Sequence, residues 1–171
     1  MVMAPEPEIV LVEGAEGLGD AFEVRFEVFV GEQGVPEEIE VDDLDDVADH
    51  FVARSGDVPL GTVRLLTRVR EGVGVLGRLA VREPARGTGL GAALVRAVED
   101  HARARGLSAI ELHAQTHAAG FYARLGYTAF CPVHGRPGEA GFSKCPCTGP
   151  GEYGPEEMEA GIPHVWMRRE L

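Results

Sequence analysis

The spacing of apolar side chains predicts a regular series of strands along the chain. Apolar residues at every second position, and short fully apolar runs, are typical of strands. Such runs occur at residues 9–12, 50–54, 60–67, 75–81, 109–114, 127–131 and 164–169. The second and third runs flank a Ser-Gly-Asp turn, so we expect them to form a β-hairpin.

Three further segments have the spacing of amphipathic helices. In residues 90–102 apolar side chains recur every three or four positions, and Gly106 is expected to end this helix. A capping box, an acid followed three residues later by a glutamate, predicts that an earlier helix begins at Asp20. A short helix over residues 121–125 is expected to end at Gly126.

The order of these elements predicts an α/β or α+β fold, because strands and helices alternate after residue 75. With 171 residues, of which 44% are apolar, the chain has the size and the core of one domain. We therefore expect a single domain over residues 1–171. Residues 131–156 are rich in Cys, Gly and Pro and interrupt the alternation, so we expect an insertion there.

Charge is distributed unevenly along the chain. The net charge is −12, which argues against a nucleic-acid-binding protein. Residues 1–60 hold 17 acids and 2 bases, whereas residues 61–130 hold 10 bases and 5 acids. A basic middle within an acidic protein indicates a local site for a small anion; chance patterning of exposed arginines is the alternative. The acidic stretch at residues 31–46 is expected to contain a turn and a short helix.

The sequence contains no feature that predicts a membrane or secreted protein. No run approaches the roughly 20 apolar residues of a membrane span. The first ten residues, MVMAPEPEIV, lack the basic and apolar regions of a secretory signal. We therefore expect a cytoplasmic protein without a membrane partner.

A glycine-rich turn, RGTGLG at residues 86–91, lies between a strand and the longest helix. The start of a helix offers unpaired backbone N–H groups and a partial positive charge, and glycines let the backbone approach a phosphate closely. The turn lacks the Gly-Lys-Ser/Thr ending of a Walker loop and fits the dinucleotide-binding pattern poorly. A turn that only reverses the chain is the alternative.

Two segments resemble motifs of the GNAT acyltransferases. LGRLAVREPARGTGLGAALVRAVEDHARARG, residues 76–106, resembles motif A, and HAAGFYARLGY, residues 117–127, resembles motif B. The segments VRFEVFVGEQGVP, LHAQTHA and GIPHVWM are similar to the ElaA-type bacterial subgroup, and coverage runs from about residue 20 to the end. The resemblance implies the GNAT acyl-CoA N-acyltransferase fold, a central mixed, mostly antiparallel sheet flanked by helices.

The same resemblance implies an acetyl-CoA-dependent N-acetyltransferase that acts on a primary amine of a small molecule or peptide. Backbone N–H groups after Arg86 would hold the pyrophosphate, an N–H near Leu79 would polarise the acetyl carbonyl, and Val81 would pair with the pantetheine arm. Gln115 would bind the pantetheine or the acceptor. The residues expected to bind the cofactor are Leu79, Ala80, Val81, Arg86, Gly87, Thr88, Gly89, Leu90, Gly91 and Gln115.

Two side chains are candidates for catalysis. Tyr122 matches the family's tyrosine that donates a proton to the CoA sulfur; packing in the core is the alternative. His113 is the first candidate for the base that takes the amine proton, because a neutral imidazole suits this task near pH 7. A strand histidine hydrogen-bonded within the sheet is the alternative for His113, and other candidate bases are Glu32, Asp42 and Asp45.

Two other functions remain open. Arg25, Phe29, Glu40, Asp42 and Asp45 also resemble the N-terminal pattern of acyl-homoserine-lactone synthases, which use S-adenosylmethionine and an acyl carrier protein. The tryptophan expected between the phenylalanine and the glutamate of that pattern is missing here. A non-catalytic CoA-binding relative is the second alternative. The sequence names no acceptor and leaves open whether the protein is a homodimer.

All three cysteines lie between residues 131 and 147. Together with a histidine they form a set that suits tetrahedral zinc, namely Cys131, His134, Cys145 and Cys147. Zinc would order a loop with few apolar residues. Free thiols, or a disulfide or redox pair, are the alternatives, and the Cys-x-Cys spacing is tighter than usual for zinc.

Overall fold

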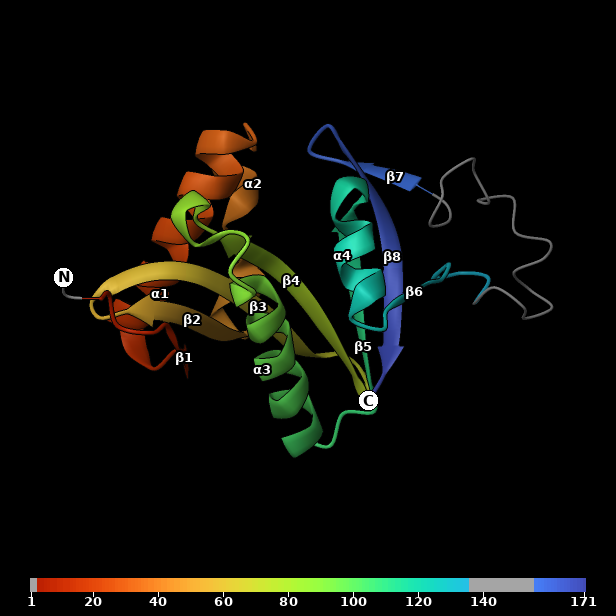
Figure 1. Cartoon of the computed structure of the whole chain (residues 1–171). Helices are drawn as coiled ribbons and strands as arrows, with labels where there is room; N and C mark the ends of the chain where they lie inside the picture. Colours follow the sequence, from red (N-terminus) through yellow and green to blue (C-terminus); the bar gives the residue numbers. More distant parts are fainter. Residues whose placement is uncertain (1–2, 136–155) are drawn as a thin grey trace. The chain divides into compact units, whose positions relative to one another are not determined.

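The computed structural model describes residues 3–135 and 156–171. Contacts divide the chain into two compact units, Met1–Leu107 and Ser108–Leu171. Figure 1 shows the elements of each unit along the chain, from red at the N-terminus to blue at the C-terminus. In the described residues, no helix combines the length and the apolar composition needed to cross a bilayer.

The first unit contains a sheet in the order β1-β2-β3-β4, with antiparallel neighbours. Its strands are β1 (Glu8–Leu11), β2 (Asp49–Ser55), β3 (Val58–Arg70) and β4 (Val73–Val81). Its helices and turns are α1 (Gly14–Arg25), η1 (Phe26–Glu32), α2 (Glu37–Glu40), η2 (Asp43–Asp46), η3 (Glu83–Ala85) and α3 (Leu90–Ala104). The strand–strand pairing follows the apolar alternation of the sequence.

The two long helices of this unit cover opposite faces of its sheet. Val24 of α1 and Val28 of η1 form a buried cluster with Ala80 of β4. On the other face, a Cβ atom at Gly61 of β3 would lie 2.9 Å from Leu94 Cδ1 of α3. Gly61 therefore lets α3 pack closely against the sheet.

The second unit is built around β8. Its elements are β5 (Ala109–Gln115), η4 (Thr116–Ala118), α4 (Ala119–Arg124), β6 (Thr128–Ala129), β7 (Glu156–Glu159) and β8 (Ile162–Glu170). β5 pairs with β8 in antiparallel register from Ala109 opposite Glu170 to Gln115 opposite His164. β6 and β7 pair antiparallel with different parts of the same strand.

The predicted elements are largely confirmed, and two predictions need correction. The first helix begins at Gly14, not at Asp20, and continues beyond Arg25 as the π-helix η1. The Asp20 carboxylate binds Arg54 Nε at 2.8 Å instead of capping a helix. The extra strand β7 has the sequence EEME, which shows no apolar alternation. The α/β class is confirmed; that both units act as one domain remains a prediction.

Candidate active site

The turn over residues 86–91 joins η3 to α3 and has the geometry of an anion-binding helix start. Gly87 and Gly89 have φ values of +75° and +87°, a region that favours glycine. Gly89 is the N-cap of α3; its first turn holds no acid, and no side chain among the described residues caps this end. The first backbone N–H groups of the helix are thus not neutralised by a carboxylate or hydroxyl of a capping residue.

Conformation, not packing, explains the two glycines. A Cβ atom built on Gly87 or Gly89 would meet no heavy atom of the described residues within 4 Å, so this part of the structure leaves the space beside the turn open. The Thr88 hydroxyl donates to the Ala85 carbonyl at 2.6 Å and fixes the turn from inside. This arrangement presents backbone to open space at the positive end of a 15-residue helix.

Arg86 lies at this turn, but its guanidinium already has protein partners. Its Nε donates to the Val81 carbonyl at 2.8 Å, and its Nη2 binds Glu32 Oε2 of η1 at 2.6 Å. The Arg86 side chain is 43% exposed, so a phosphate can compete with Glu32 for it. The sequence did not indicate this pairing, because the two residues are 54 positions apart.

β4 contains a β-bulge before the turn. Gly77 lies opposite Arg64 and Ala80 opposite Thr62, so Arg78 and Leu79 together oppose one residue of β3. The extra residue of a bulge leaves the regular ladder and bends its strand. Arg78 has φ of +53°, which is uncommon for a residue with a side chain. The irregularity falls where the family resemblance places the carbonyl-binding N–H.

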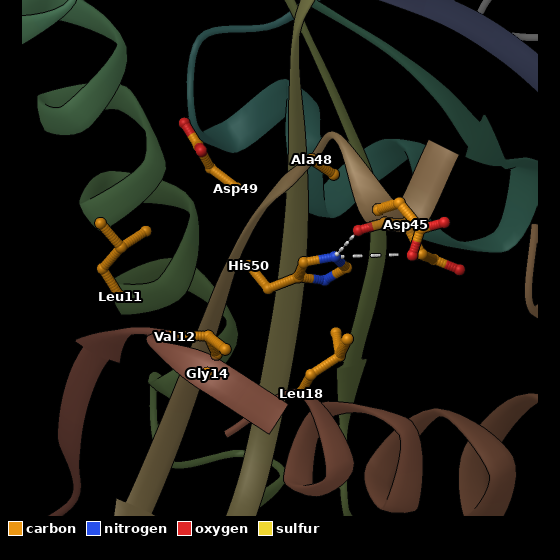
Figure 2. A pocket seen from close by; sticks show the side chains of 9 residues that line it. Leu11, Val12, Gly14, Leu18, Asp45, Ala48, Asp49 and His50 are labelled. Atoms are coloured by element: carbon orange, nitrogen blue, oxygen red, sulfur yellow. Dashed lines mark hydrogen bonds and ion pairs between the residues drawn. The ribbon is translucent and has the colours of Figure 1, made fainter. Parts of the chain in front are cut away.

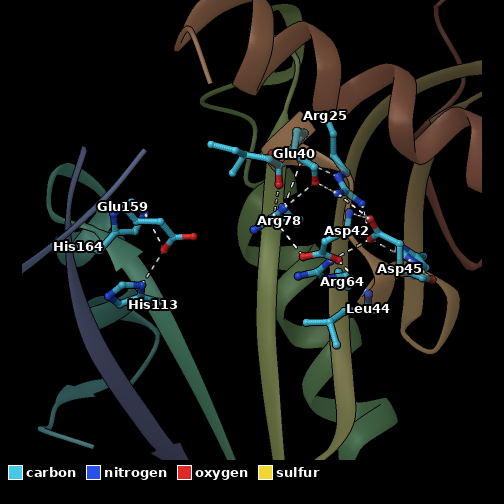
Figure 3. Close-up of polar contacts among 12 residues, drawn as sticks. Arg25, Glu40, Asp42, Leu44, Asp45, Arg64, Arg78, His113, Glu159 and His164 are labelled. Carbon is cyan, nitrogen blue, oxygen red and sulfur yellow. Dashed lines mark hydrogen bonds and ion pairs between the residues drawn. The ribbon is translucent and has the colours of Figure 1, made fainter. Parts of the chain in front are cut away.

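A buried ionic network lies behind this bulge (Figure 3). Arg25 Nε binds Glu40 Oε1 at 2.7 Å, and Arg25 Nη1 binds Asp45 Oδ1 at 2.7 Å. Arg64 Nη1 binds Asp42 Oδ1 at 2.7 Å and Asp45 Oδ1 at 2.9 Å. We call these residues, with Arg78, the Arg25 network. It holds three guanidiniums and three carboxylates.

The network holds Asp45 as an ionised carboxylate. Burial alone would raise the pKa of Asp45, but hydrogen bonds from Arg25, the Asp42 backbone N–H and Arg64 outweigh it and lower the pKa to about 2. A carboxylate with this pKa is a poor proton acceptor. Asp42 and Glu32 are likewise held in ion pairs with arginines, so the geometry favours none of these three acids as the base.

A pocket of about 300 Å³ in the same unit is lined by residues of β1, α1 and the 45–50 segment (Figure 2). His50 Nε2 lies 2.9 Å from the Asp45 carbonyl, and burial lowers the pKa of His50, so its neutral ring donates there. None of the residues expected to bind CoA lines this pocket.

Tyr122 lies on α4 in the second unit and is buried. Its ring makes edge-to-face contacts with Phe121 at 5.0 Å and with Tyr127 at 5.9 Å between ring centroids. Burial raises the pKa of Tyr122, so its phenol keeps its proton at neutral pH. The α4 helix ends before Gly126, as predicted, and Gly126 has φ of +95°.

His113 belongs to a stack of rings on the β5–β8 pair. Its ring lies 4.5 Å from that of Trp166 and 4.8 Å from that of His164. His113 Nδ1 is 2.8 Å from Glu159 Oε2 of β7 (Figure 3). Its Nε2 is buried and has no hydrogen-bond partner among the described residues, with a Glu157 oxygen 3.6 Å away. Sequence analysis found His113 but not Glu159.

The predicted cofactor residues therefore fall in both units. Those from Leu79 to Gly91 follow one another in the first unit, whereas Gln115 ends β5 in the second, opposite His164. The zinc hypothesis receives no support. Cys131 Sγ lies 3.3 Å from His134 Nδ1, but Cys145 and Cys147 lie outside the described residues. Within those residues, no group of three or more His, Cys, Asp or Glu side chains could hold a metal ion.

Comparison with known proteins identifies the class. The family described as "Acetyltransferase (GNAT) family" matches residues 17–127. The chain is 35% identical over 161 residues to a Bacillus subtilis (strain 168) protein named "Uncharacterized N-acetyltransferase YjcF", covering 94% of this chain and 98% of that protein. The chain therefore belongs to the GNAT family of acetyltransferases, and it is an N-acetyltransferase of that family.

Solved structures agree with this assignment. An acyl-CoA N-acyltransferase from Pseudomonas aeruginosa has a TM-score of 0.73 and 29% identity, covering 96% of this chain and 99% of that one. ElaA of Escherichia coli has a TM-score of 0.72 and 22% identity over the same shares. A Bacillus subtilis acetyltransferase in complex with CoA has a TM-score of 0.62 and 19% identity, covering 97% and 99%. The last two show the fold, and the expected resemblance to GNAT proteins is confirmed.

Proposed function

We propose that this N-acetyltransferase moves the acetyl group of acetyl-CoA directly to a primary amine of a small molecule or peptide. The observation that carries the proposal is the uncapped start of α3, which follows two glycines with positive φ and faces open space. Backbone N–H groups of residues 87–91 bind the pyrophosphate of CoA, because a helix start combines unpaired donors with a partial positive charge.

Arg86 completes the pyrophosphate site in this proposal. Its guanidinium now binds Glu32. A pyrophosphate carries more charge than one carboxylate and offers more acceptor oxygens, so it displaces or shares that partner. The acetyl carbonyl then lies beside the bulge of β4, where the Leu79 N–H stabilises the oxyanion that develops during attack. Val81 and Ala80 continue the strand toward the turn and bind the pantetheine arm, with Gln115 as a further partner.

The reaction forms a bond between the amine nitrogen and the acetyl carbon and breaks the bond between that carbon and sulfur. We assign Tyr122 as the general acid that protonates the leaving thiolate of CoA. The phenol is protonated at neutral pH, as a general acid must be, and burial raises its pKa. Its edge-to-face contacts with two rings hold the side chain in one orientation.

We assign His113 as the base that takes the proton from the attacking amine, directly or through water. Its hydrogen bond to Glu159 places the proton of the neutral ring on Nδ1, because an ionised carboxylate only accepts. The lone pair is then on Nε2, the buried nitrogen that has no hydrogen-bond partner among the described residues. Glu159 thus selects the tautomer that a base needs.

The acceptor is proposed to be a cation before it loses its proton. The first 60 residues carry a large excess of acids, and such a field favours an incoming ammonium ion. The acyl-homoserine-lactone synthase alternative receives no specific support, since the tryptophan of its pattern is absent. A cytoplasmic location completes the proposal, where acetyl-CoA is available.

The proposal is tested by acetyl transfer from acetyl-CoA to a panel of primary amines, followed as release of free CoA thiol. We expect transfer by the wild-type protein and a fall in kcat of about 10²-fold in Tyr122→Phe, the size expected for a lost proton donor. The ring still packs in this variant, and Phe121→Leu serves as a control for ring packing alone. Turnover that requires S-adenosylmethionine, or CoA binding without transfer to any amine, contradicts the proposal.

A further inference from the structure

The conformation of Arg78 is unusual for its residue type. Its φ of +53° lies in the left-handed region, where a Cβ atom crowds the backbone. Glycine adopts this region without crowding and is the common residue at such bulges. Gly77 directly precedes Arg78 in β4, yet the positive φ falls on the arginine and not on the glycine. The Arg78 side chain is therefore expected to make contacts that offset the strain of this backbone conformation.

The Arg78 guanidinium ties the bulge to the segment that follows η1. Its Nε lies 3.3 Å from both the Glu40 carbonyl oxygen and Glu40 Oε1. Its Nη2 lies 3.4 Å from the Ile39 carbonyl and 3.4 Å from Asp42 Oδ2. The Arg78 side chain is only 19% exposed. Four acceptors from residues 39–42 thus surround one side chain of β4 (Figure 3).

The partners of Arg78 are themselves fixed. Glu40 is held by Arg25, which is 1% exposed and also donates to the Glu40 backbone carbonyl. Asp42 is held by Arg64, and it caps η2 through Leu44 N–H. Glu40, Arg25 and Arg64 are buried and Asp42 is partly exposed, so the acceptors cannot move without breaking ion pairs that are mostly shielded from water. Arg78 thus binds Glu40 and Asp42, whose own positions are fixed by Arg25 and Arg64.

Leu79 is the next residue of the bulge, and its N–H belongs to the peptide group that follows Arg78. We propose that Arg78 is a positioning residue: its guanidinium, held by Glu40 and Asp42, fixes the β4 bulge so that the Leu79 N–H meets the carbonyl oxygen of the acetyl group. This inference rests on the proposed function. In this inference the Arg25 network sets the geometry of the peptide group between Arg78 and Leu79, which binds the acetyl carbonyl, and does not itself contact the substrate.

The tether and the backbone conformation can be separated by mutation. Arg78→Gly allows the positive φ at residue 78 and removes the guanidinium contacts with residues 39–42. Arg78→Ala removes the same contacts but keeps the crowding of a Cβ atom. Asp42→Asn keeps Arg78 and weakens one of its partners. Arg68→Gly is the matched control, because it removes an exposed arginine from the neighbouring strand β3 outside the network.

We expect Arg78→Gly to lower kcat about 10-fold, because a small misplacement of a catalytic group is costly in rate. The Kd for CoA should stay within 2-fold of wild type, since residues 86–91 bind the pyrophosphate. Arg78→Ala should lower kcat by at least as much, and Asp42→Asn should lower it by less. Arg68→Gly should keep the wild-type kcat. A contact made only in the transition state changes kcat without changing ground-state binding.

Amide hydrogen exchange of the free protein gives a readout that needs no activity. In Arg78→Gly we expect faster exchange in residues 77–81 and 39–42, and unchanged exchange in α3. Wild-type kcat or unchanged exchange at the bulge in a folded Arg78→Gly protein overturns the inference. If wild-type protein transfers no acetyl group to any amine, the proposed function fails instead, and the exchange measurement still decides whether Arg78 holds the bulge.

Discussion

The Arg25 network of the first unit and the group of charged and aromatic side chains around His113 in the second unit differ in access to water. The Arg25 network in the first unit holds Arg25 and Asp45 with side chains 1% and 3% exposed. In the second unit, His113 is bound by Glu159 and lies near Glu157, whose side chains are 46% and 61% exposed. The first cluster is closed around Arg25 and Asp45, although Asp42 at its edge is 33% exposed, whereas the carboxylates of the second cluster are open to water.

This difference in exposure distinguishes charges that hold the fold together from groups that can exchange a proton with substrate or water. In the Arg25 network every carboxylate has a guanidinium partner, so a change of protonation breaks buried ion pairs. Around His113 the carboxylates reach water and the ring has one nitrogen without a hydrogen-bond partner in the described residues. A group that must gain and lose a proton in each turnover belongs in the second environment. We therefore expect stability to depend on the first cluster, which affects the rate only by positioning the β4 bulge, and proton transfer to depend on the second cluster.

The largest expected effect follows from neutralising Asp45. Asp45→Asn leaves Arg25 and Arg64 buried without their shared carboxylate, and such losses cost about 3–5 kcal/mol. Denaturant unfolding monitored by circular dichroism measures this change. Asp46→Asn is the matched control, because the Asp46 side chain is exposed, and we expect less than about 0.5 kcal/mol there. A similar small change in both variants contradicts the closed character of the network.

The same carboxylate gives stability a defined dependence on pH. Its pKa falls from 3.8 to about 2 in the folded protein. A lowered pKa contributes stability above the unfolded value, and this contribution is lost as pH falls from about 4 through 2. Wild-type stability should therefore drop over this interval more steeply than that of Asp45→Asn. Parallel pH profiles for the two proteins would show that Asp45 is not held ionised by its arginines.

The open cluster is expected to change rate without changing stability much. His113→Gln should lower kcat about 10²-fold, the size of a lost general base, and should leave the free energy of unfolding close to that of wild type. Glu159→Gln should lower kcat about 10-fold, because a neutral amide no longer selects the Nδ1 tautomer. Glu156→Gln, on the same strand, is the control and should match wild type. An unchanged kcat in His113→Gln assigns the histidine to packing in its ring stack.

Much of the fold could be predicted because its signals are local and periodic. The helix ending near Gly106, the turn with Gly87 and Gly89, and the alternation in β4 each follow from neighbouring residues. The Arg25 network left no such signal, since Arg25 contacts residues 15 and 20 positions away through side chains of ordinary composition. The bulge was hidden as well, because its effect is a shift of one residue within an otherwise regular alternation.

Other parts were missed because sequence rules point to a competing outcome. Asp20 and Glu23 satisfy the capping pattern, yet the helix already begins at Gly14 and uses Asp20 to bind Arg54. The π-helix η1 continues that helix with apolar residues on several sides, which gives no distinct period. Glu159 stands in a polar strand that forms only because β8 provides the pairing edge. Tertiary contacts decide each of these cases.

The central claim is that CoA binds at the turn between β4 and α3, and isothermal titration of CoA into Gly89→Val tests it most directly. Gly89 has φ of +87° and faces open space, so valine disturbs the backbone that meets phosphate while leaving the core in place. Gly106→Ala, at the other end of α3 with φ of +77°, controls for strain at a positive φ. The account predicts micromolar binding by wild type and by the control, with at least a 10-fold loss in Gly89→Val. Wild-type affinity in a folded Gly89→Val protein would place CoA elsewhere and contradict the account.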